Sequence, residues 1–152
     1  MKAEIVTARY EHISHIAANV RESDRQELFD YSLLSPVEAL ERSYSISKLA
    51  WTGLIDGEPV VMFGVVSASL LSDTGIPWMI GTTELDKHQI TFLKRCKPVV
   101  HKMNMCYKRL ENYVAAYNIK AIQWLKWLRF EFDEPQPMGL FKKPFIKFHM
   151  GN

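Results

Sequence analysis

A long amphipathic helix between two β-type segments constrains the fold of this chain most. Residues 88–107 place apolar side chains at spacings of three and four, which predicts a helix with one buried face. β-rich runs flank it at 76–82 and 110–116. A crossover of that length joins parallel neighbours in a sheet, so we expect the two flanking strands to be adjacent and parallel. Pro98 predicts a kink or a break in the helix near Lys97.

The segments before that helix have the pattern of an antiparallel meander. Residues 49–55 and 60–68 are rich in β-branched side chains, and Asp56-Gly57 between them predicts a tight hairpin. The run at 76–82 follows a short loop and extends the hairpin. A first strand is expected at 3–8, where apolar and polar residues alternate.

Three helices are expected between the first strand and the hairpin. The first buries a stripe from Ile13 to Val20. The second starts at Ser23-Asp24 and buries Leu28, Phe29 and Leu33. The third starts at Ser35-Pro36, followed by Glu38 in a capping-box arrangement. The remaining elements expected are a helix at 119–128 and strands at 130–132 and 144–150.

Length and composition indicate one domain, residues 1–152. With 47% hydrophobic residues the chain can bury one sizeable core, and it has no apolar run of the roughly 18 residues that span a bilayer. Its N-terminal residues do not resemble a secretion signal. Cys96 and Cys106 are expected on one helix about 15 Å apart, which is too far for a disulfide. No metal site is expected, and a reducing cytoplasm fits these cysteines.

Charge is distributed unevenly along the chain. Residues 1–86 contain 6 Lys/Arg against 13 Asp/Glu, a balance of −7, and residues 87–152 contain 13 against 4, a balance of +9. The stretch 87–109 has seven basic residues and no acid. This asymmetry predicts either an anionic ligand or partner, or association between copies of the chain. Nucleic acid is not expected as a partner, because no base-reading motif accompanies the basic residues.

The order of the elements, together with a motif near residue 118, resembles the GNAT superfamily of N-acetyltransferases. A strand ends near Tyr117, and Asn118 and Ala121 then open a helix that ends at Leu128-Arg129-Phe130. The resemblance implies an α/β fold, strictly α+β: a mixed, mostly antiparallel central sheet, splayed between its fourth and fifth strands and flanked by helices. It also implies acetyl-CoA as the acyl donor and an amine as the acceptor.

The C-terminal half also resembles a narrower group. Residues 110–132 and the segment Phe145 to His149 are similar to the small GNAT-like internal virion protein A family of short-tailed bacteriophages. That resemblance implies a location in the host cytoplasm or in the virion. It also implies a protein partner in the phage particle or the host.

The GNAT resemblance assigns candidate site residues. The cofactor-binding candidates are Met79, Ile80, Gly81, Lys87 and Asn118, with a backbone N–H near Ile80 stabilising the oxyanion. Glu84 and His88 are the catalytic candidates, acting as general base together with the neighbouring Asp86.

Two departures from the superfamily pattern leave a second function open. The stretch 81–89 has one glycine and two acids where related enzymes bind pyrophosphate, and Leu125 occupies the position of a proton-donating tyrosine. The chain is therefore interpreted either as an N-acetyltransferase or as a catalytically degenerate GNAT-like phage protein that binds a virion or host partner.

Overall fold

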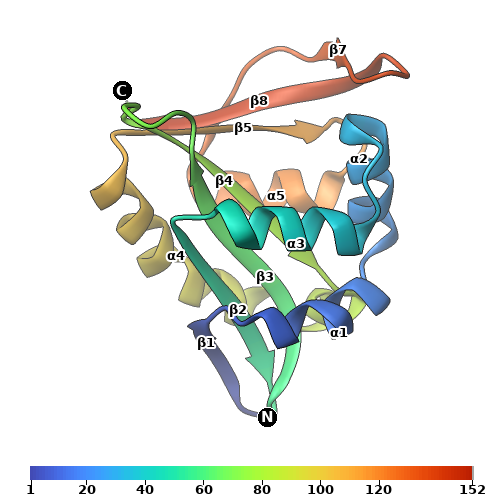
Figure 1. The fold of residues 1–152 in the computed structure, drawn as a ribbon, viewed down its shortest axis with the longest axis vertical. Coiled ribbons are helices and arrows are strands. Elements are labelled where there is room, and N and C mark those ends of the chain that lie inside the picture. The colour runs from blue at the N-terminus through green and yellow to red at the C-terminus, as the bar shows by residue number, and fades with distance from the viewer. Residues whose placement is uncertain (152) are drawn as a thin grey trace.

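The computed structural model describes residues 1–151, which form an eight-stranded mixed sheet with helices on both faces (Figure 1). The strands are β1 (Ala3–Thr7), β2 (Leu49–Ile55), β3 (Glu58–Ser67), β4 (Thr74–Gly81), β5 (Arg109–Ala115), β6 (Glu131–Phe132), β7 (Gln136–Met138) and β8 (Lys143–Gly151). The helices are η1 (Tyr10–His12), α1 (Ile13–Ala18), α2 (Glu22–Ser32), α3 (Pro36–Ile46), η2 (Thr83–His88), α4 (Gln89–Cys106) and α5 (Ile119–Trp127).

The sheet order is β1-β2-β3-β4-β5-β8-β6, with β7 paired to β8. Every pairing is antiparallel except that of β4 with β5. The predicted crossover is thereby confirmed: α4 returns the chain so that β5 starts beside β4 in the same direction. No helix among the described residues is long and apolar enough to cross a membrane.

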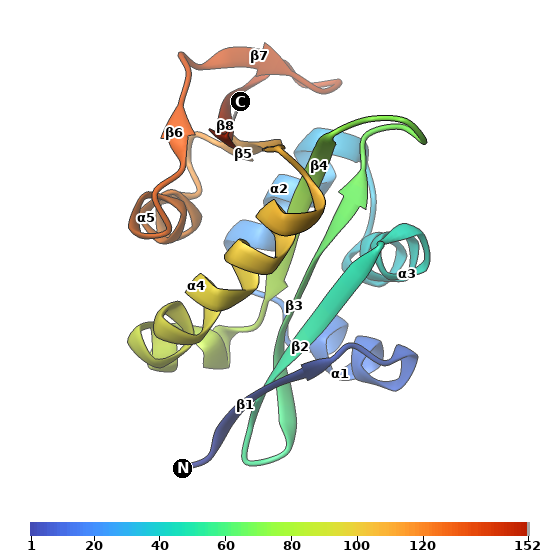
Figure 2. The same ribbon diagram turned by 90° about the vertical axis from the view of Figure 1, so that its left-hand side faces the viewer.

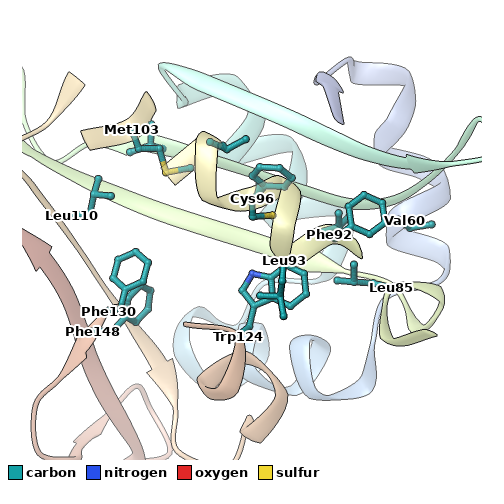
Figure 3. Packing of buried hydrophobic residues seen from close by; sticks show 14 of the residues in the cluster. Val60, Leu85, Phe92, Leu93, Cys96, Met103, Leu110, Trp124, Phe130 and Phe148 are labelled. Carbon is teal, nitrogen blue, oxygen red and sulfur yellow. The ribbon is translucent and has the colours of Figure 1, made fainter. Parts of the chain in front are cut away.

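Two hydrophobic clusters lie on opposite faces of the sheet. One packs α4 and α5 against the sheet, and the other packs α1 and α3 against the opposite face (Figure 2). In the first cluster Phe92 and Leu110 are fully buried, and Phe130 meets Phe148 edge to face with ring centroids 5.1 Å apart (Figure 3). Burial of this apolar surface stabilises the sheet between the helices.

The strongest local sequence signals are confirmed. Asp56 and Gly57 adopt positive φ angles of 48° and 83°, as a two-residue hairpin turn requires. At the start of α3, Ser35 Oγ accepts a hydrogen bond from the Glu38 N–H, and the Glu38 carboxylate accepts one from the Ser35 N–H. These two contacts complete the predicted capping box.

Other expectations are corrected by tertiary packing. Pro98 lies inside α4 without breaking it, because Cys96, Val99 and Met103 hold both halves of the helix in the core. Val20 lies beyond α1 and forms a β-bridge with Thr82. Neither the short helix η2 at Thr83–His88 nor the strand β7 was predicted.

The second helix differs most from its prediction. α2 begins at Glu22, with Arg21 rather than Ser23 as its N-cap residue. Asp24 and Asp30 are its buried residues, whereas Phe29 and Leu33 are exposed. The predicted apolar stripe is therefore wrong for Phe29 and Leu33, whereas Leu28 packs against the core beside the inward-facing acids of α2.

β4 and β5 pair at only two positions before they separate. The ladder joins Thr74 to Arg109 and Gly75 to Leu110. Beyond it the Asn112 carboxamide lies between the strands: Nδ2 donates to the Pro77 carbonyl at 2.7 Å, and Oδ1 accepts from the Tyr113 N–H at 2.7 Å. Pro77 has no N–H with which to continue the ladder. The side chain thus replaces a backbone hydrogen bond and spaces the strands apart.

Replacing Asn112 with Ala should lower the free energy of unfolding by about 1–3 kcal/mol, because the Tyr113 N–H and the Pro77 carbonyl lose their partners. Urea denaturation measures the loss. Asn104→Ala serves as the control, since the Asn104 amide contacts only the weakly accepting Met150 sulfur. Equal losses in the two variants would contradict a spacer role for Asn112.

Candidate functional site

A cavity of about 500 Å³ lies where β4 and β5 separate. Successive β4 side chains face opposite sides of the sheet, and both Met79 and Trp78 line the cavity, so it extends through the gap from one face to the other. We call its two parts the α4 compartment and the α3 compartment. The α4 compartment is lined by Cys96, Val99, Met103, Trp124 and Leu125, and the α3 compartment by Leu28, Tyr31, Leu34, Ile46 and Trp78.

The backbone of β4 presents alternate residues to this gap. The Arg109 N–H donates to the Asp73 carbonyl, which places the odd-numbered β4 positions on the β5 side. The Thr82 N–H donates to the Val60 carbonyl, which places the even-numbered positions on the β3 side. The Ile80 N–H therefore points to β3. The neighbouring N–H that faces the cleft is that of Met79, and an oxyanion-stabilising role for a backbone N–H near Ile80 stays a prediction.

Helix α2 closes the mouth of the gap by binding the ends of both strands. Asp24 Oδ2 accepts from the Gly81 N–H at 2.9 Å, and Glu27 Oε1 accepts from the Ala115 N–H at 2.7 Å. Asn118 Nδ2 donates to both carboxylates, at 3.2 Å and 3.3 Å. The same Asn118 side chain accepts from the Ala121 N–H and caps α5, as its position in the sequence predicts.

The two carboxylates differ in how they are neutralised. Asp24 is buried and forms an ion pair with the buried Arg21, whose Nε and Nη2 donate to it at 3.0–3.2 Å. Glu27 has no such partner, and within residues 1–151 no hydrogen bond engages its Oε2. Its remaining accessible surface lines the cavity. Glu27 thus brings one uncommitted carboxylate oxygen to the gap.

Burial raises the pKa of Glu27 from 4.5 to about 7, and the nearby Asp24 charge adds to this effect. The hydrogen bonds from Ala115 and Asn118 and the charge of Arg21 act in the opposite direction but do not prevail. A carboxyl group with a pKa near neutrality exchanges protons readily at physiological pH. It can therefore act as a general base.

The predicted site residues fall into two groups. Met79, Ile80 and Asn118 line the cavity, and Gly81 lies at its mouth on Asp24. Glu84, Lys87 and His88 lie on η2 and do not line it; Glu84 pairs with Lys87 at 3.3 Å and with His88 at 3.4 Å. Glu84 and His88 as catalytic residues, and Lys87 as a cofactor ligand, stay predictions.

The two acids of the η2 segment are both neutralised. Lys87 and then His88 lower the pKa of Glu84. Asp86 accepts from Lys120 at 2.7 Å and from Arg21 at 3.1 Å, and these contacts lower its pKa although burial opposes them. The acids are thus less repulsive to an anionic ligand than the sequence alone indicates.

Glu27 was missed by sequence reasoning. The available signal was a spacing of three: Asp24, Glu27 and Asp30 recur along α2, and Arg21 precedes them at the same spacing. Acidic residues at that spacing usually form a solvated face, whereas here the Asp30 carboxylate is buried and accepts from the Tyr117 hydroxyl at 2.7 Å. The decisive partners lie on β4, β5 and the start of α5, far away in sequence.

Solved structures of similar shape identify the fold. An N-acetyltransferase from Staphylococcus aureus superposes with a TM-score of 0.76 at 12% identity, with 99% of each chain covered. The fold is that of the GNAT acetyltransferases. yncA from Salmonella typhimurium, solved with acetyl-CoA, superposes at 0.76 and 9% identity, covering 99% of this chain and 94% of its own. A phosphinothricin acetyltransferase from Sinorhizobium meliloti, also with acetyl-CoA, gives 0.74 and 13%, with 99% and 89% covered.

Sequence comparison adds nothing to this result, because no family profile and no curated protein matches the chain. The predicted fold is confirmed, including the mostly antiparallel sheet and the parallel fourth and fifth strands. At these identities the likeness extends to the fold alone. The fold does not determine the chemistry, which depends on the residues of the cavity.

The raised pKa of Glu27 makes the stability of the protein depend on pH. The folded chain holds the Glu27 proton between pH 4.5 and about 7, whereas the unfolded chain releases it. The contribution of Glu27 to the free energy of unfolding is fully present below pH 4.5 and is lost as the pH rises through 7. The loss is on the order of 3 kcal/mol. Urea denaturation from pH 5 to 8 should show a decline in the free energy of unfolding of wild type, and this decline should be smaller in Glu27→Gln.

Glu22→Gln is the control, because Glu22 is exposed on the same helix, and it should keep the decline. An undiminished decline in Glu27→Gln would contradict the raised pKa of Glu27.

Proposed function

We propose that this protein is an N-acyltransferase that transfers an acyl group from acetyl-CoA to a primary amine. The observation that carries the proposal is Glu27, which lines a cavity that joins the two faces of a splayed GNAT sheet and whose Oε2 atom accepts no hydrogen bond within residues 1–151. Two substrates that enter from opposite faces would meet in this gap. Glu27 is placed there to take a proton.

The residues of the gap fit an extended thioester donor. When bound, acetyl-CoA supplies an acyl group activated as a thioester. The Met79 N–H is the cleft-facing donor that would polarise the acyl carbonyl. Asn118 lies on the opposite wall, and Lys87, Lys94 and Arg95 bring positive charge to the start of α4 for the phosphates.

Direct attack by the amine fits this site better than an acyl-enzyme route. Cys96 lines the α4 compartment, but burial raises the pKa of its thiol to about 12, so it stays protonated. In the direct reaction the amine nitrogen bonds to the acyl carbon and the carbon–sulfur bond breaks. Glu27 would accept the proton that the neutral amine loses on attack. The coenzyme A thiolate would leave and take a proton from solvent, to which Glu27 returns its own.

A second candidate is a GNAT-like protein that has lost catalysis and binds a virion or host partner in an infected cell. Two observations favour it. Leu125 lines the cavity and has no proton to donate to a leaving thiolate. Asp24 and Glu27 already occupy the Gly81 and Ala115 N–H groups, which an extended ligand would otherwise bind.

Calorimetry with acetyl-CoA separates the two candidates, and Glu27→Gln tests the mechanism. The variant keeps an acceptor for the Ala115 N–H, so we expect acetyl-CoA to bind within about threefold of wild type. We expect kcat to fall by about 100- to 1,000-fold, and the limb of the pH profile near 7 to disappear. Glu22→Gln is the control and should behave as wild type. No heat of binding with acetyl-CoA would refute the transferase and leave the partner-binding candidate.

A further inference from the structure

We propose that the acceptor is a compact primary amine with an apolar body, such as an arylalkylamine, rather than a polyamine or a peptide. This inference rests on the proposed function, because it assumes that the α3 compartment receives the amine. Three features of that compartment support it: the Glu27 carboxylate, the Arg42 guanidinium and the apolar walls.

The compartment offers one carboxylate to a bound amine. Asp24 is saturated by Arg21, the Gly81 N–H and Asn118. Asp30 does not line the cavity, and its two oxygens accept from Gln26 and Tyr117. Only Glu27 among the acids that line the cavity keeps an uncommitted oxygen within residues 1–151. One amino group can therefore be paired.

A second positive charge on the acceptor would be opposed. Arg42 lines the α3 compartment from helix α3 and is exposed at its rim. An amine that extends outward from Glu27 toward this rim would bring a second ammonium group near the guanidinium. Like charges at short range repel, so the compartment selects against a polyamine.

The walls select against a peptide for a different reason. Leu28, Leu34 and Ile46 present apolar side chains, and the Trp78 Nε1–H is already donated to Ser47 Oγ at 2.7 Å, which leaves the ring to the cavity. The polar side chains that α2 and α3 add beside the acids and Tyr31 are few: Ser32, Arg42 and Ser43. A peptide in this compartment would therefore bury most of its amide groups without partners, which is costly. An aromatic or aliphatic body loses nothing there and gains contact with Trp78 and Tyr31.

Three probes test the inference: 2-phenylethylamine, spermidine and a lysine-containing peptide. Their binding to the coenzyme A complex is measured by calorimetry, and thiol release from acetyl-CoA gives kcat/KM. We expect 2-phenylethylamine to bind and to exceed the other two by at least tenfold in kcat/KM. Ile46→Glu adds a carboxylate at the rim and should shift the ratio toward spermidine by at least tenfold. Val37→Glu, exposed on the same helix but outside the cavity, should leave the ratio unchanged.

The outcomes distinguish the acceptor class from the transferase activity. Transfer that favours spermidine or the peptide would overturn the acceptor class and leave the transferase intact. Saturable binding of 2-phenylethylamine that weakens in Ile46→Glu, without transfer, would support the compartment chemistry and refute catalysis. Equal kcat/KM for all three amines, unchanged by Ile46→Glu, would overturn the inference.

Discussion

The architecture of the site depends on how backbone hydrogen bonds are replaced where β4 and β5 separate. Two strands that part inside a protein leave N–H and carbonyl groups without ladder partners, and such groups are costly if unpaired. Here the Asn112 carboxamide satisfies the first pair, and carboxylates of α2 satisfy the Gly81 and Ala115 N–H groups farther along. The cavity therefore persists because side chains replace the ladder at both ends of the gap.

A glutamate at position 27 is not needed to bind the Ala115 N–H group. A glutamine would accept the Ala115 N–H equally well and would avoid the cost of ionising a buried group. Burial instead holds the pKa of Glu27 near 7, whereas Arg21 compensates the adjacent Asp24. A stabilising role alone does not require an acid that the fold leaves uncompensated. In the proposed reaction, Glu27 is the group that takes up and releases the proton.

The sequence predicts the framework better than it predicts the site, and the reason is the range of the interactions. The hairpin turn at Asp56-Gly57, the box at Ser35 and the Asn118 cap each depend on neighbours within a few residues. The contacts that define the site span 57 residues from Asp24 to Gly81 and 88 from Glu27 to Ala115. Local periodicity predicted Leu28, Phe29 and Leu33 on the buried face of α2, and of these Leu28 alone lies inward. Asp24 and Glu27 of α2 face inward because their carboxylates accept hydrogen bonds from the N–H groups of the separated strands.

The acidic and basic halves of the chain lie on different sides of the cavity, because the sheet divides it into two compartments. The acidic segment 1–86 supplies α2 and α3, which line the α3 compartment, and the basic segment 87–152 supplies α4 and α5, which line the other. In the proposed reaction a cationic amine would approach the acidic segment and an anionic coenzyme the basic one. Screening limits such attraction to about 8 Å at physiological salt, so it acts at the mouths of the cavity. Opposite net charge on the two sides of the sheet is enough to draw the two substrates to different mouths of the cavity. The chain provides it because the acidic segment ends and the basic segment begins just after β4.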